Sequence, residues 1–182
     1  MLKLFLTNVV LETTDSDKHW YVVLTRTNSE RKVRDYFQLQ EVDTFLPVQN
    51  RLIEREGKRI ERERLLLPRM VFVHISRQEM AAVRSTLNVY DFLRDRSTGP
   101  PTCIPDAQMA DFRYMLDYSQ DQVILTGESI PKGTRVVVAK GDLQGLRGEL
   151  VRYNNKYHIL VRIDMFGSAM VTIPASYVRK EK

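Results

Sequence analysis

Two continuous apolar runs stand out in the first half of the chain. Residues 20–25 (Trp-Tyr-Val-Val-Leu-Thr) and residues 70–75 (Met-Val-Phe-Val-His-Ile) are rich in aromatic and β-branched side chains, which is typical of strands covered on both faces. Residues 43–48 contain Pro47, which cannot donate to a central ladder, so we expect an edge strand there. Residues 89–93 predict a further short strand.

Amphipathic stretches separate these runs. Two of them begin with a capping box, Thr27-x-x-Glu30 and Ser76-x-x-Glu79, and a third is expected to begin at Asp106. The apolar positions at helical spacing are Val33, Phe37, Met80, Val83, Leu87, Met109, Phe112 and Leu116. The alternation predicts an α/β domain in which helices flank an antiparallel or mixed sheet.

A charged segment, residues 51–64, interrupts this domain and has Gly57 at its middle, which predicts a solvated hairpin. It contains six basic and four acidic residues. Because these opposite charges nearly cancel, a solubilising surface is the interpretation that the composition favours.

The last third of the chain has a different character. Residues 128–182 contain ten Lys/Arg and five Asp/Glu, whereas residues 1–127 contain eighteen of each, so the net charge of +5 lies entirely in this part. Short β-rich runs alternate there with glycine-containing turns, which predicts a small all-β barrel. Its runs Val136-Val137-Val138 and Ile159-Leu160-Val161 favour strands over helices.

The segment 136–151 resembles a KOW motif. The positions that carry this resemblance are Gly141, Asp142, Leu143, Gly145 and Gly148. Glycine permits positive φ and close backbone approach, which gives such a motif a physical basis.

The whole arrangement resembles the NusG family of transcription elongation factors. The resemblance rests on residues 20–23, Phe45-Leu46-Pro47, residues 67–73 and a KOW module that is closed by residues 166–178. It is greatest for specialised paralogues typified by RfaH and by the UpxY antiterminators of capsular-polysaccharide operons. In the family, Arg69 is usually Gly or Asn, and Met70 is usually Tyr.

The resemblance implies an arm (1–17), a NusG N-terminal-like α/β domain (18–118), a linker (119–130) and a KOW domain (131–182). A protein of this kind would bind the clamp helices of RNA polymerase and suppress pausing or termination in an operon-specific way. The KOW domain would recruit a further partner, for which ribosomal protein S10 and Rho are family precedents. Whether the two domains rest on each other is left open by the sequence.

The resemblance also implies two sets of contact residues. The polymerase-binding residues are Leu24, Met70, Phe72 and Phe92. The residues expected to face the non-template DNA strand are Arg26, Lys32, Tyr36, Gln40 and Thr86. A lysine or arginine can hold phosphates, and a tyrosine can stack on an unpaired base. From the residues alone, an ordinary core is the favoured interpretation of the first set, and a solvated helix face is the alternative interpretation of the second.

No catalytic motif accompanies these patterns, so we expect a binding protein without enzymatic activity, cofactor or metal. One alternative is an RNA-binding ribosomal or ribosome-assembly protein with a KOW motif, although the neutral first two thirds argue against rRNA coating. A second alternative, a small hydrolase, would rest only on a carboxylate pair such as Asp15 and Asp17. With a single cysteine, Cys103, and no cleavage pattern near its N-terminus, we expect a cytoplasmic monomer without membrane contact.

Overall fold

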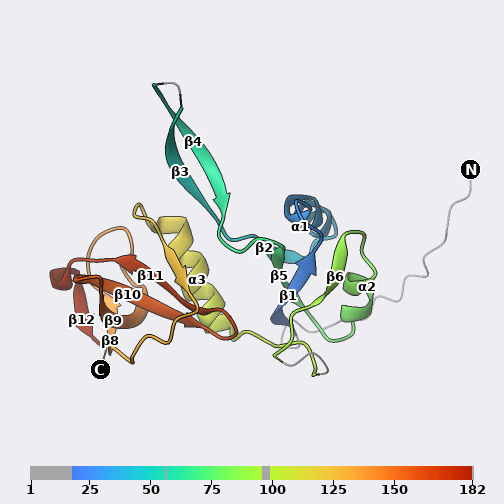
Figure 1. Cartoon of the computed structure of the whole chain (residues 1–182). Helices are drawn as coiled ribbons and strands as arrows, with labels where there is room; N and C mark the ends of the chain where they lie inside the picture. The colour runs from blue at the N-terminus through green and yellow to red at the C-terminus, as the bar shows by residue number, and fades with distance from the viewer. Residues whose placement is uncertain (1–17, 56, 96–98, 182) are drawn as a thin grey trace, which may run out of the picture.

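The computed structural model describes residues 18–55, 57–95 and 99–181. The predicted arm, residues 1–17, lies outside the described residues, as do Asp15 and Asp17. The described chain forms a four-stranded sheet, a six-stranded sheet and a separate two-stranded hairpin (Figure 1).

The first sheet contains four antiparallel strands in the order β2-β5-β1-β6. These are β1 (His19–Thr25), β2 (Asp43–Phe45), β5 (Met70–Ile75) and β6 (Val89–Phe92). The antiparallel alternative is therefore confirmed, and β2 lies at an edge, as Pro47 predicted.

Both faces of this sheet are covered, which explains the continuous apolar runs. Tyr21 and Val23 pack with α1 (Glu30–Leu39) and α2 (Met80–Arg84) in one core. Trp20 and Val22 belong to a second core with α3 (Asp106–Tyr118). Successive residues of a strand point to opposite faces, so each central strand contributes to both cores.

The two capping boxes have different outcomes. The backbone N–H of Ser76 donates to a Glu79 carboxylate oxygen at 2.7 Å, which is one of the two hydrogen bonds of a capping box. The other is not made, since the N-cap of α2 is Glu79 and the Ser76 hydroxyl has no hydrogen-bond partner. At α1 the N-cap is Ser29 rather than Thr27, and Ser29 makes no side-chain cap hydrogen bond. Glu30 is instead buried and accepts the backbone N–H of Arg69 at 2.8 Å. The prediction of a capping box at Thr27 and Glu30 was therefore wrong, because the Glu30 carboxylate accepts a hydrogen bond from Arg69, which is 39 residues away in the sequence.

The second sheet is all antiparallel, in the order β12-β8-β9-β10-β11-β7. Its strands are β7 (Ile124–Thr126), β8 (Thr134–Val138), β9 (Arg147–Tyr153), β10 (Lys156–Ile163), β11 (Gly167–Thr172) and β12 (Val178–Lys180). A 3₁₀ turn, η2 (Ala175–Tyr177), precedes β12. The prediction of strands rather than α-helices in the C-terminal third is confirmed, whereas β7 lies inside the segment predicted to be a linker.

Helix α3 lies between the two sheets (Figure 1). The Tyr114 hydroxyl donates to the carbonyl oxygen of Gln144 at 2.8 Å, and the Asp164 N–H donates to the side-chain oxygen of Gln108 at 2.9 Å. One apolar core continues from the first sheet through α3 into the second sheet. The two halves of the chain are therefore docked together.

An ion pair joins the central strands of the second sheet. Arg162 donates from Nε and Nη2 to the two carboxylate oxygens of Glu149, each at 2.8 Å. Glu149 also accepts the N–H of Gly133 at 2.8 Å. The Arg162 hydrogen bonds lower the pKa of Glu149 below its usual value, against an opposing effect of burial.

Replacing Glu149 by glutamine should lower the free energy of unfolding by about 1–2 kcal/mol near neutral pH, because charge-assisted hydrogen bonds are lost. The folded-state pKa is depressed, so this stabilisation is present above the ordinary glutamate pKa. It disappears as the pH falls through the depressed pKa. Urea unfolding at both ends of this range measures the difference, with the exposed Glu128→Gln as control. A Glu149→Gln effect that persists at low pH would contradict the assignment.

Candidate functional site

Three of the four predicted polymerase-binding residues lie on one face of the first sheet. Leu24 and Met70 are paired in the register of β1 and β5, and Phe72 follows two residues later on the same face. Leu24 and Met70 are half-buried, whereas Phe72 is completely buried. The Phe72 ring lies 5.9 Å from Phe45. We call Leu24, Phe45, Met70 and Phe72 the apolar face.

Phe92 is not brought to this face. It pairs with Val23 in the register of β1 and β6, and paired residues share a face. Its ring makes an edge-on contact with Tyr21 at 6.2 Å, inside the core beneath α1 and α2. The structure therefore places Phe92 on the opposite side of the sheet from Phe72.

The C-terminal sheet and α3 cover the apolar face. Phe112 of α3 lies 6.2 Å from Phe72, and Phe166, in the turn between β10 and β11, lies 5.5 Å from it. Arg113 of α3 lies over the Trp20 and Phe45 rings at 5.3 and 5.5 Å. Phe166 was expected only to help close the KOW module, and Arg113 was not expected to have a role, because contacts between distant segments leave no local signal in the sequence.

Three of the predicted DNA-facing residues surround one hollow on the other side of the sheet. Lys32 and Tyr36 lie one turn apart on α1, and Thr86 follows α2. The hollow has a volume of about 420 Å³ and is also lined by Ala82, Ser85, Leu87 and Asn88. Residues separated by some fifty positions in the sequence thus meet at one site, which we call the α1–α2 hollow.

The chemistry of this hollow suits an unpaired nucleotide. Tyr36 is 48% exposed and Leu87 is 81% exposed, so an aromatic and an aliphatic side chain are available for stacking. Lys32 supplies a cation at the rim, and the Thr86 hydroxyl donates to the Ala82 carbonyl at 3.2 Å. The prediction of Leu87 as an apolar position of a helix face was wrong, because α2 ends at Arg84 and the Leu87 side chain is exposed in the following loop. Asn88 was not predicted, since an exposed polar loop residue leaves no pattern in the sequence.

The other two predicted DNA-facing residues lie nearby without lining the hollow. The backbone N–H of Arg26 donates to the carbonyl of Asn88 at 2.9 Å, and its side chain is exposed. Gln40 is the C-cap of α1, one turn beyond Tyr36. Arg26 therefore borders the site through its loop, and Gln40 lies farther along the helix.

Four of the KOW-like residues lie in the tight loop between β8 and β9, and the fifth, Gly148, lies within β9. Gly145 has a φ of +97° and donates its N–H to the carbonyl of Val138 at 2.9 Å. At Gly148 a Cβ would lie 2.7 Å from the carbonyl oxygen of Leu160, so any side chain would clash. Leu143 is buried, whereas Gly141 and Asp142 are exposed. This loop meets α3 through the Tyr114 hydrogen bond to Gln144.

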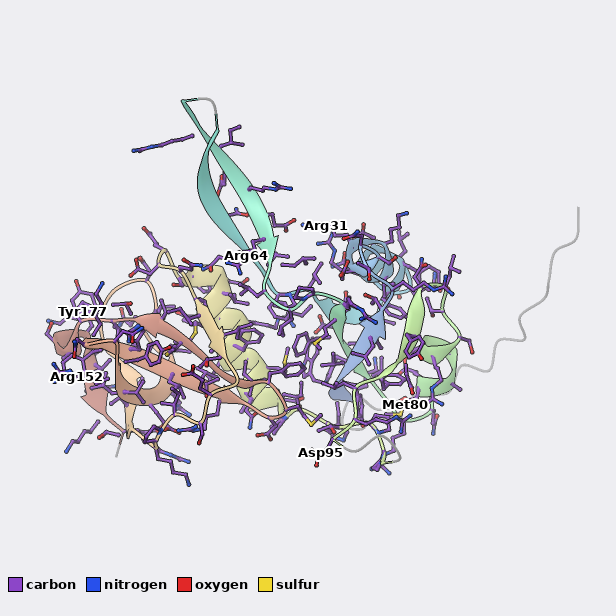
Figure 2. All side chains as sticks on the ribbon, in the orientation of Figure 1. Arg31, Arg64, Met80, Asp95, Arg152 and Tyr177 are labelled. Atoms are coloured by element: carbon purple, nitrogen blue, oxygen red, sulfur yellow. The ribbon has the colours of Figure 1, made fainter. Side chains whose placement is uncertain are left out.

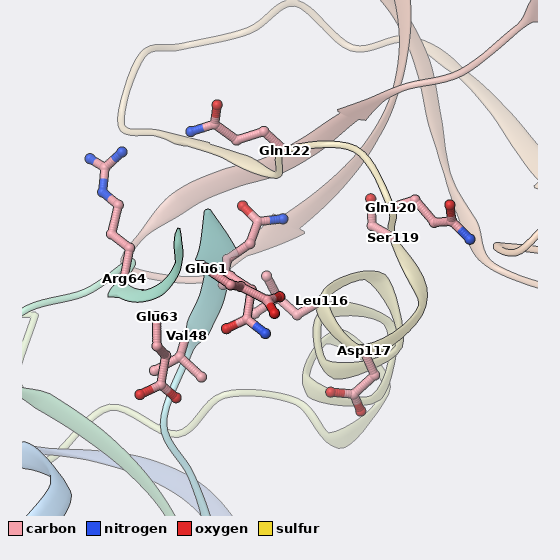
Figure 3. Close-up of a pocket in the computed structure, with 11 residues that line it drawn as sticks. Val48, Glu61, Glu63, Arg64, Leu116, Asp117, Ser119, Gln120 and Gln122 are labelled. Atoms are coloured by element: carbon pink, nitrogen blue, oxygen red, sulfur yellow. The ribbon is translucent and has the colours of Figure 1, made fainter. Parts of the chain in front are cut away.

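A larger hollow of about 700 Å³ lies where the hairpin meets the end of α3. The hairpin consists of β3 (Val48–Arg55) and β4 (Lys58–Leu65). Figure 3 shows Glu61 and Leu116 beside this hollow. Within the described ranges, no group of three His, Cys, Asp or Glu residues is placed to hold a metal ion.

A family model described as "Transcription termination factor nusG" matches residues 18–113, which is more than half of the chain. The chain belongs to the NusG family. Members of the NusG family are transcription factors rather than enzymes. A comparison with curated proteins finds no match.

Solved structures also resemble this NusG family member. The structure described as "Domain interaction in Thermotoga maritima NusG" is 19% identical, with 92% of this chain and 99% of that chain covered and a TM-score of 0.49. The MjSpt4:Spt5 complex in conformation A is 14% identical, with coverages of 90% and 98% and a TM-score of 0.27. Among the described residues, no helix has the length and apolar character needed to cross a bilayer.

Arg69 departs from the residues that the NusG family usually has at this position, and the structure supplies a reason for the family preference. Its φ is +64°, in the left-handed region that glycine and asparagine tolerate best. The Glu30 carboxylate accepts the Arg69 N–H, and the Arg69 carbonyl accepts the N–H of Thr25 at 2.8 Å. These two hydrogen bonds hold an arginine in a conformation that is otherwise unfavourable for it.

Proposed function

We propose that this protein is an elongation and antitermination factor that binds the clamp helices of RNA polymerase and acts on particular operons. Membership of the NusG family supports a role in transcription. The observation that carries the more specific proposal is the α1–α2 hollow, where Lys32, Tyr36 and Thr86 meet. A factor that bound polymerase without reading DNA would not need such a site.

In this proposal the hollow receives a base of the exposed non-template strand. Lys32 would hold a phosphate, and Tyr36 would stack on the base. The polar rim at Thr86 and Asn88 would offer hydrogen bonds to a base edge. Phosphate contacts position a strand and base contacts select its sequence, so one hollow would serve both needs.

The apolar face would bind the polymerase clamp helices through Leu24, Met70 and Phe72. Phe166 lies against Phe72 in the docked arrangement, so polymerase and the C-terminal domain would compete for this face. We therefore propose that the docked form is inactive and that the two domains separate on binding. The released C-terminal domain, a KOW barrel in this proposal, would then be free to recruit ribosomal protein S10 or Rho.

A run-through assay on polymerase halted at a pause tests the DNA-reading part of this proposal. The wild-type protein should shorten the pause, and Tyr36→Ala should reduce this effect about tenfold, because base stacking is worth about 1–3 kcal/mol. Lys32→Ala should weaken the effect on every pause sequence alike.

The matched control is Gln38→Ala, which changes an exposed residue of the same helix outside the hollow. Gln38→Ala should behave as the wild type does. If Tyr36→Ala and Gln38→Ala act equally well, the hollow does not read DNA. Polymerase binding without a change in pausing would contradict the antitermination function itself.

A further inference from the structure

A further hollow lies between the end of α3 and the second sheet, and the proposed function does not use it. It has a volume of about 320 Å³, at the lower end of the range of small-molecule sites. Its walls come from segments that are distant in the sequence, namely residues 118–121, residues 140–143, and residues 171–174 with Tyr177. We call it the seam hollow, because it exists only while α3 and the second sheet are packed together.

Two partly exposed tyrosine rings line the seam hollow. Tyr118 is 54% exposed and Tyr177 is 39% exposed. The Tyr118 ring lies 4.5 Å from the ring of Tyr114, whose hydroxyl donates to the carbonyl of Gln144. The Tyr177 ring packs on Gly141, where a Cβ would lie 3.0 Å from it. Figure 2 shows Tyr177 at the end of the second sheet that lies away from the first sheet. Neighbouring residues therefore hold both rings in place and leave part of each ring open to a ligand.

The seam hollow has a negative balance of charge. Asp121 and Asp142 line it, and Lys140 is the single basic residue among those that line it. Helix α3 ends beside it without a basic residue in its last turn. The C-terminus of a helix has a partial negative charge of about half a unit. This balance favours a cation and disfavours a phosphate group.

The other walls of the seam hollow are apolar or anchored. The buried side chains of Leu143 and Ile173 line it. The backbone carbonyl of Asp121 accepts hydrogen bonds from the Gln49 side chain at 3.1 Å and from the Ser119 hydroxyl at 2.7 Å. The loop after α3 is thus already held against the base of the hairpin, so a ligand would have little chain to order on binding.

We propose that the seam hollow binds an aliphatic polyamine, a ligand in which methylene chains join several ammonium groups. Ammonium groups lie favourably over tyrosine rings and beside carboxylates, and methylene groups pack on apolar walls. A nucleotide would also stack on the rings, but its phosphates would meet the two aspartates and the negative end of α3. A bound polyamine would link α3 to the second sheet and so stabilise the arrangement that covers the apolar face. Its effect on polymerase binding rests on the proposed function, whereas the binding itself does not.

Isothermal titration of the full chain with spermidine at 0.1 M salt, without polymerase, tests this site. The wild type should bind spermidine at one site. Asp142→Asn should weaken binding about fivefold, the upper end of the effect of a solvent-exposed ion pair. Tyr177→Leu keeps an apolar side chain over Gly141 and should weaken binding by about the same factor, because the cation loses its aromatic partner. Lys140→Gln should strengthen binding, since it removes the one opposing charge.

Asp117→Asn is the matched control. Asp117 is exposed in the last turn of α3, but it lines the hollow beside the hairpin and not the seam hollow. Asp117→Asn should bind spermidine as the wild type does. If Asp117→Asn and Asp142→Asn weaken binding equally, a diffuse negative charge attracts spermidine and the proposal is wrong. Asp142 is exposed, so equal unfolding temperatures without ligand should show that its variant is folded.

Two competing ligands complete the test. Putrescine should displace spermidine, whereas Mg²⁺ should displace it no better than NaCl of equal ionic strength, because Mg²⁺ has no apolar body. Displacement by Mg²⁺ as effective as that by putrescine would contradict a polyamine site. The proposal is also wrong if the chain binds ATP in place of spermidine and Lys140→Gln weakens that binding, since the hollow would then accept an anion.

Discussion

Replacing Met70 by aspartate is expected to abolish the binding of this protein to RNA polymerase while leaving its fold intact. Met70 lies at the rim of the apolar face and is half-buried, so the free protein can keep a carboxylate there in contact with water. At a polymerase contact the same carboxylate would be buried without a partner, at a cost of about 3 kcal/mol or more. That cost corresponds to a loss of affinity of at least about a hundredfold.

The measurement is a binding titration with polymerase, accompanied by circular dichroism of the variant. Phe72 is a poorer choice for substitution because it is completely buried, and a charge at its position would unfold the domain. Leu39→Asp is the control, since Leu39 is 81% exposed on α1 and lies outside the apolar face. A folded Met70→Asp variant that binds as tightly as the wild type would remove this face from the polymerase contact.

The two central strands of the first sheet were predictable because strands buried on both faces are continuously apolar. This pattern can be recognised in the sequence without knowing which strands pair or in what register. Residues 20–25 and 70–75 are continuously apolar, and both strands contribute alternate residues to two cores. The position of Phe92 was not predictable in this way. Its face depends on which residue of β1 it pairs with, and that pairing includes an irregularity between Leu24 and Thr25. A shift of one residue reverses the face, and the sequence does not fix the shift.

Sequence patterns at the starts of helices predicted a hydrogen bond correctly only where no distant residue competes for the same carboxylate. The Ser76 and Glu79 pattern forms its hydrogen bond because both groups lie within one turn. Glu30 instead satisfies the N–H of Arg69, a residue whose left-handed backbone turns that N–H toward the start of α1. The sequence suggests the first contact through spacing alone, whereas the second exists only after the chain has folded.

The candidate site, too, contains some features that the sequence suggested and others that depend on contacts between distant segments. Three residues of the α1–α2 hollow, Lys32, Tyr36 and Thr86, were named in advance only through the resemblance to the NusG family, whereas their spacing alone fits a solvated helix face equally well. The contributions of Leu87 and Asn88 depend on how the loop after α2 returns to the sheet, where Arg26 binds Asn88. The docking of the two domains left no sequence signal, since the apolar residues that it buries also fit an ordinary core.

Replacing Phe166 by aspartate is expected to strengthen polymerase binding, in the direction opposite to the Met70 variant. Phe166 lies in the turn between β10 and β11 and contacts Phe72 at 5.5 Å, so its charged replacement should weaken the docking of the C-terminal domain. Loss of a partly buried phenylalanine contact is worth about 2 kcal/mol. If polymerase binds only the undocked form, its apparent dissociation constant is the intrinsic value divided by the undocked fraction. The apparent affinity should therefore rise by up to about thirtyfold.

The comparison uses Tyr157→Asp as its control, because Tyr157 is 46% exposed on β10 and does not belong to the apolar core that joins α3 to the two sheets. Tyr157→Asp should bind polymerase as the wild type does. The double variant Met70→Asp, Phe166→Asp should fail to bind polymerase. Separation of the domains would expose the apolar face, but the carboxylate at position 70 would still be buried without a partner at the polymerase contact. An unchanged affinity of Phe166→Asp, with both domains folded and shown to be separated by small-angle scattering, would mean that docking does not compete with polymerase. In that case the shared core between the two sheets would have a structural role only.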